Sequence, residues 1–164
     1  MKDSRILRTF KISTIEGIFA QIYGALATGN GVFLVKLLGM LSANPLHYSL
    51  LTAIGQISQV FQVFGVAVDH YFKNRKKNCL WLTFIGRFLS FFLGLAFLFR
   101  SSNQGIYFVL AIFLFSSAFL SIGANIWIAW IADLIPLKFR GRFMSRRAQI
   151  LLICSLVVSY AISI

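Results

Sequence analysis

Ionisable side chains inside apolar stretches are the residues of this sequence with the clearest capacity for chemistry. Arg87 lies in the middle of a long apolar run, and Glu16 lies near the start of another. A charge at the centre of a bilayer costs at least about 2.5–3.5 kcal/mol on insertion scales, so Arg87 needs a reason to be there. Two interpretations stay open: a contact to an anionic substrate or membership of a coupling ion pair, or a structural pairing with Glu16 or backbone carbonyls. Glu16 itself is interpreted as a solvated or paired helix-end residue.

The other reactive groups do not form the converging nucleophile and base that an enzyme needs. Cys79 and Cys154 are isolated, without a CxxC motif or a neighbouring His, so neither predicts a disulfide or a metal site. His47 and His70 are expected at opposite membrane surfaces. We therefore expect no enzymatic activity, no cofactor and no bound metal.

Composition excludes an ordinary soluble domain. Hydrophobic residues make up 59% of the 164 residues and charged residues only 12%, against about a quarter in soluble proteins. The net charge of +12 would suit nucleic acid, but 13 of the 16 basic residues fall into three clusters separated by long apolar stretches. We expect a lipid bilayer, and no nucleic acid, as the partner of this surface.

The apolar stretches predict an all-α, polytopic transmembrane bundle. A helix needs about 20 apolar residues to cross the hydrocarbon core, and lipid leaves the backbone no other way to satisfy its polar groups. We expect a basic N-terminal segment over 1–14 and a bundle over 15–164, with helices at about 15–40, 46–71, 79–99, 106–135 and 148–164. The last run reaches Ile164 without a cap or an anchor, so we expect a truncated chain.

The basic clusters predict the orientation. With five spans, the N-terminal segment, the 72–78 loop and the 136–147 loop share one side and hold the 13 clustered Lys and Arg residues. Because cytoplasmic loops carry an excess of Lys and Arg, the N-terminus is expected in the cytoplasm. The protein is thus expected to be an integral, multi-pass protein of a cytoplasmic or inner membrane.

Polar and small residues share one face of several predicted helices. In the third helix, Thr83, Gly86, Arg87, Ser90 and Gly94 form a stripe opposite Phe84, Phe88 and Phe91. Such stripes serve helix packing as readily as solute binding. If they line a watery cavity, its candidate residues are Tyr23, Asn30, Gln59, Gln62, Arg87, Ser121 and Asn125.

Two predicted cytoplasmic loops place one carboxylate each beside a cluster of cations. The first is Gly65-Val-Ala-Val-Asp69-His70-Tyr-Phe-Lys73-Asn-Arg75-Lys76-Lys77, and the second is Asp133-Leu-Ile-Pro136-Leu-Lys-Phe-Arg140-Gly141-Arg142. Gly65 permits a close helix approach, and Pro136 ends the fourth helix because it disfavours helical geometry in Ile135.

These loops resemble those of the major facilitator superfamily. Its signature after the second helix is Gly, three residues, Asp and then basic residues, which Gly65, Asp69, Arg75 and Lys76 fit, although His70 stands where Arg or Lys is usual. Asp133, Pro136, Arg140 and Gly141 are similar to the loop after its fourth helix. The resemblance covers 15–164, the first five of about twelve helices. An Arg in the fourth helix, associated with proton-coupled exporters, is missing.

The resemblance implies secondary active transport of a small solute by alternating access, with or without a coupling ion. It implies, too, a C-terminal half that completes the transporter. It also implies that Asp69 and the loop cations form a cytoplasmic latch, with Asp133 as a partner of Arg75 or Lys76. The alternatives are cations that only set topology, and a non-transporting membrane protein such as an assembly factor or a degenerate fragment.

Overall fold

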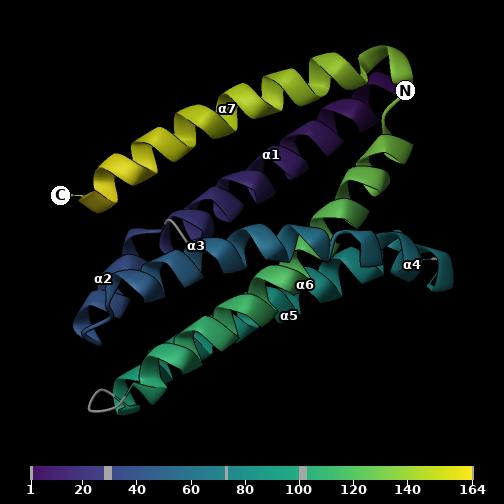
Figure 1. The fold of residues 1–164 in the computed structure, drawn as a ribbon. Helices are drawn as coiled ribbons and strands as arrows, with labels where there is room; N and C mark the ends of the chain where they lie inside the picture. The colour runs from purple at the N-terminus through teal and green to yellow at the C-terminus, as the bar shows by residue number, and fades with distance from the viewer. Residues whose placement is uncertain (1, 28–30, 73, 100–102, 164) are drawn as a thin grey trace.

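The protein, seen in a computed structural model, is helical throughout the regular structure of its described residues, which are 2–27, 31–72, 74–99 and 103–163. This confirms the predicted all-α class. Figure 1 shows the helices in chain order. They are α1 (Lys2–Ala27), α2 (Val32–Met40), α3 (Pro45–Val60), α4 (Val63–Tyr71), α5 (Arg75–Phe91), the 3-10 helix η1 (Phe92–Phe99), α6 (Gln104–Leu134) and α7 (Leu137–Ser163).

Local capping explains where two of these helices begin. The Asn44 side chain accepts a hydrogen bond from the His47 amide at 3.2 Å, and the Asn44 amide donates to His47 Nδ1 at 3.1 Å. Together with Pro45 at the first turn, this reciprocal pair starts α3. Asn74 caps α5 by accepting from the Lys77 amide at 3.3 Å. His47 is therefore a capping residue.

Several expected boundaries differ from the structure. The helix expected over 46–71 is bent by 41° between α3 and α4. The expected loops are mostly helical: α5 already begins at Arg75, because Asn74 caps it, and α7 begins at Leu137, directly after Pro136. The basic residues of 138–147 therefore stand on a helix, where spacing along the chain fixes which of them share a face.

Two apolar clusters hold the bundle at its two ends. The cluster at one end joins α2 and α3 to η1 and the first half of α6, with Leu34, Leu37, Leu51, Ile106 and Val109 almost fully buried. At the other end, Ile131, Ile135 and Phe143 pack with Phe10. Figure 1 shows α7 running alongside α1, and α5 alongside α6, in agreement with their contacts. Polar side chains gather between the two clusters.

The described residues include three helical stretches that are long and apolar enough to cross a membrane. These are Leu7–Met40, which includes the undescribed 28–30, Arg75–Ala96 and Gln104–Leu134, with a fourth if the bent pair α3 and α4 counts as one span. The fifth expected span, 148–164, is described up to residue 163, where it lies in α7, and it is not among them. Large apolar side chains such as Phe91 (81%) and Phe19 (65%) are exposed, as lipid contact requires.

Candidate functional site

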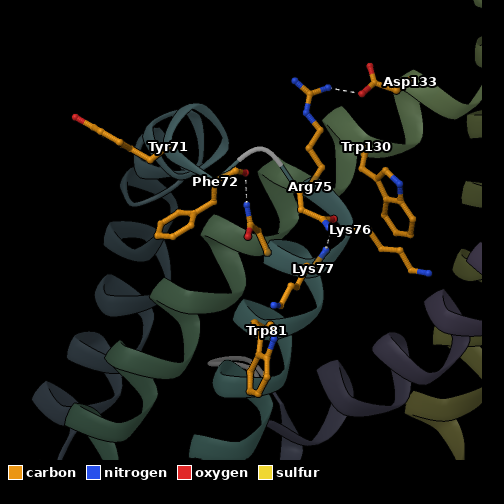
Figure 2. Close-up of a pocket in the computed structure, with 10 residues that line it drawn as sticks. Tyr71, Phe72, Arg75, Lys76, Lys77, Trp81, Trp130 and Asp133 are labelled. Carbon is orange, nitrogen blue, oxygen red and sulfur yellow. Dashed lines mark hydrogen bonds and ion pairs between the residues drawn. The ribbon is translucent and has the colours of Figure 1, made fainter.

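Arg75 joins two carboxylates from two other helices at one end of the bundle. Its Nε donates to both oxygens of Asp69 at 2.9 Å, and its Nη2 lies 2.7 Å from Asp69 Oδ2. Its Nη1 donates to Asp133 Oδ2, as Figure 2 shows. The three residues, which we call the end cluster, tie the end of α4, the start of α5 and the end of α6 together. Charge-assisted hydrogen bonds are stronger than neutral ones, and the half-buried Asp69 gains more from them than Asp133, whose side chain is 60% exposed and therefore screened by solvent.

The remaining residues of the two loop motifs have different roles. Gly65 is buried, and a Cβ there would lie 3.0 Å from Asn125 Cβ, so α4 and α6 approach closely at this point. Arg140 donates to the carbonyls of Ala132 and Ile135 and so caps the end of α6. Lys76 and Gly141 are exposed. Lys76 lines the open cavity of about 930 Å³ beside the end cluster.

Four of the predicted cavity residues do line one cavity. Tyr23, Gln59, Gln62 and Ser121 enclose about 310 Å³ between α1, α3 and α6, with Gln62 donating to Gln59. Arg87 lines a neighbouring cavity of about 300 Å³, which shares Tyr23 with the first. Asn125 is not among the lining residues of either cavity, because it fills the close approach of α4 and α6 at Gly65. Asn30 lies outside the described residues.

Hydroxyl groups connect the helices around these cavities. Tyr23 Oη forms hydrogen bonds with the hydroxyls of Ser90 and Ser116, which lie 3.1 Å from each other. Ser116 also donates to the Gly86 carbonyl at 2.7 Å. Ser58, which is fully buried, bonds to Ser117 at 2.6 Å. Ser116 and Ser117 of α6 therefore bond to hydroxyls and a backbone carbonyl of other helices, which is the packing role that small polar residues take in membrane bundles.

Glu16 lies between two arginines in the middle of the bundle. Its Oε1 is 3.2 Å from Arg87 Nη2, and its Oε2 is 3.6 Å from Arg147 Nη2. Arg87 lies over the ring of Tyr23 and Arg147 over the ring of Trp127, at 5.7 and 4.3 Å from the centroids. We call Glu16, Arg87 and Arg147 the inner cluster. Of the two interpretations of Arg87, the pairing with Glu16 is present, and it leaves a substrate contact open.

Arg147 is the residue of this region that sequence reasoning missed. The sequence predicts it in the 136–147 loop, whereas α7 carries it into the bundle. Arg140, Phe143 and Arg147 follow a spacing of three and four residues, which places them on one helix face. That spacing, read as helical, is a signal for the buried position of Arg147.

The chain was compared with protein-family models, with curated proteins and with solved structures, and none of them matches it.

Proposed function

We propose that this chain spans the membrane several times with its N-terminus in the cytoplasm and forms the first part of a secondary transporter of the major facilitator superfamily type. In this proposal, a small solute is moved by alternating access, and the cavities bounded by Tyr23 are part of its path. The end cluster acts as the cytoplasmic latch, which is broken and remade as the two halves of the transporter move against each other.

The observation that carries the proposal is the end cluster itself. Asp69 and Asp133 belong to two different motifs and lie more than sixty positions apart in the sequence, yet both contact Arg75. Cations that only set topology would have no need of carboxylates from two other helix ends. A latch does need them, because it must hold helix ends together in one state and release them in another.

The positions of the other charges support the orientation. Phe10 contacts Phe143 edge to face at 5.3 Å, so the basic starts of α1 and α7 are neighbours. The end cluster lies at this same end of the bundle, and the turn between α2 and α3 lies at the opposite end (Figure 1). The described segments that carry the clustered cations, the starts of α1, α5 and α7, therefore gather at one end, which we propose to be the cytoplasmic side under the positive-inside rule.

Solute uptake tests the proposal. The whole reading frame that contains this chain is purified, placed in liposomes and offered a defined mixture of labelled metabolites, after which the trapped contents are measured by mass spectrometry. We expect at least one solute to accumulate above its level in empty liposomes, and the Arg75→Gln variant to lose most of that uptake. Lys138→Gln, which removes an exposed cation elsewhere on the same side, is the matched control.

Two results would count against the proposal. If no solute of the mixture accumulates above the level in empty liposomes, the non-transporting alternative stands in its place. If uptake occurs but Arg75→Gln matches the wild type, transport stands and the latch does not.

A further inference from the structure

The inner cluster contains two guanidinium groups and one carboxylate. Each arginine reaches Glu16 through a single Nη2, at 3.2 Å for Arg87 and 3.6 Å for Arg147. Tight charge-assisted hydrogen bonds are about 2.7–2.9 Å long, and arginine commonly binds a carboxylate through two parallel bonds. Glu16 is thus shared loosely between two cations and saturates neither of them.

The two arginines differ in how firmly the protein holds them. Arg147 donates from its Nε to the Ser13 carbonyl at 3.2 Å, lies over Trp127, and has a side chain only 15% exposed. The Arg87 side chain is 33% exposed. Its Nε is buried and, within the part of the chain that the structure describes, has no hydrogen-bond partner. A guanidinium carries five N–H donors, so Arg87 has donors left for a second acceptor.

Charge and space indicate what that acceptor is. The inner cluster carries one positive charge in excess, which is costly between helices in lipid and which one negative charge would offset. Glu16, Tyr23, Arg87, Trp127 and Arg147 all line the same cavity of about 300 Å³. A second space of about 360 Å³ shares Glu16, Arg87 and Trp127 and adds the rings of Phe84 and Phe88. A charged end and an aromatic wall therefore adjoin.

We propose that the inner cluster binds a small organic monocarboxylate with an aromatic or otherwise apolar body. The ligand's carboxylate accepts hydrogen bonds from Arg87 and displaces Glu16 from it, and Glu16 stays beside Arg147. The ligand's apolar body packs against Trp127 and Phe88. This inference rests on the proposed function and names the substrate class for the same cavity. A monoanion fits better than a phosphate, which carries nearly two charges at neutral pH.

Direct binding of benzoate tests the inference. The purified whole protein in detergent is dialysed to equilibrium against radiolabelled benzoate, with empty micelles as background. We expect saturable binding of benzoate. Neither benzamide, a neutral molecule of the same shape, nor chloride at equal ionic strength is expected to displace the bound benzoate. We expect Arg87→Gln to weaken binding about 10–100-fold, the loss of hydrogen bonds to a charged group. Arg142→Gln, an exposed cation on α7, keeps the wild-type affinity.

Glu16 gives the sharpest outcome. Because Glu16 competes with the ligand for Arg87, Glu16→Gln is expected to bind benzoate severalfold more tightly than the wild type. The inference is overturned if Glu16→Gln binds benzoate more weakly than the wild type, or if benzamide displaces benzoate as well as benzoate itself does. It is also overturned if chloride does so, which would mean a nonspecific anion site only. If Arg87→Gln does not fold, Arg87→Lys keeps the charge without the planar fork and is expected to bind more weakly than the wild type. The comparison of benzoate with benzamide needs no variant.

The two proposals can fail separately. Uptake of neutral solutes without benzoate binding would leave transport standing and remove the anion site. Benzoate binding with the Glu16→Gln gain, in a protein that accumulates no solute, would keep the anion site and remove transport.

Discussion

Gly86 sets the separation of α5 and α6, and replacing it with Ala is expected to weaken the bundle. A Cβ at this position would lie 2.7 Å from Leu120 Cγ and 3.0 Å from the Ser116 carbonyl oxygen. The Leu120 side chain can rotate away. The Ser116 carbonyl is backbone, and the Ser116 hydroxyl also ties the two helices together by donating to the Gly86 carbonyl, so this contact yields only if the helices move apart.

The size of the effect follows from two opposing contributions. Overpacking a tight contact costs about 1–3 kcal/mol. Ala in place of Gly within a helix recovers about 0.5–1 kcal/mol. We therefore expect Gly86→Ala to lower the free energy of unfolding by about 0–2.5 kcal/mol, and by about 1–3 kcal/mol relative to a Gly→Ala change without the clash.

Gly55 is the matched control, because a Cβ there would meet nothing within 4 Å. Gly55→Ala carries the same gain in helix stability without the clash, so the difference between the two variants isolates the contact. The assay is unfolding in mixed micelles by increasing SDS, followed by the fluorescence of Trp81 on α5 and of Trp127 and Trp130 on α6. If both variants change stability equally, the close approach of α5 and α6 at Gly86 is refuted.

Three further predictions address other parts of the bundle. Ser58→Ala is expected to cost about 1 kcal/mol in the same unfolding assay, because it removes a buried hydrogen bond to Ser117; an unchanged stability, equal to that of the exposed Ser49→Ala, would contradict it. Arg75→Gln is expected to lengthen the mean distance between spin labels at the exposed positions 71 and 137 and to broaden its distribution, as measured by pulsed electron paramagnetic resonance. An unaltered distribution would show that the end cluster does not hold these helix ends together. In a variant lacking Cys79 and Cys154, a membrane-impermeant maleimide added to intact cells is expected to label Leu46→Cys but not Lys138→Cys, and the reverse pattern would invert the orientation.

Periodicity gave the helical class and many of the buried faces correctly. In α5, Gly86 of the predicted stripe is buried against α6, while Phe84, Phe88 and Phe91 are exposed. This succeeds because lipid accepts large apolar side chains and close packing selects small ones. Gly94, expected on the same stripe, lies in η1 and is exposed, because the 3-10 helix buries Leu93 and Ala96 instead. Pro136 likewise ends α6 where the sequence predicts, whereas the Asn74 cap starts α5 at Arg75, within the expected loop.

Contacts between residues far apart in the chain are harder to predict from the sequence. The contact between Arg75 and Asp133 follows from the resemblance of two motifs, since nothing in the local sequence relates residues 58 positions apart. The sequence does not predict the bend between α3 and α4, because no Pro lies there and Gly65 comes after the bend. Asn125 was assigned to the cavity from its polarity, yet it fills the space that Gly65 leaves. Arg147 lies in the bundle and not in a loop, because the basic stretch that contains it is helical.

The inner cluster also constrains the order in which the protein can be built. Glu16 is synthesised early, while Arg87 follows it by 71 positions and Arg147 comes later still. At about 5–20 residues per second of translation, the first counter-charge follows after about 4–14 s. During that interval the first helix carries an acidic group with neither arginine beside it, so, in a chain that inserts into a membrane, this helix is expected to wait at the edge of the insertion machinery until the later helices arrive.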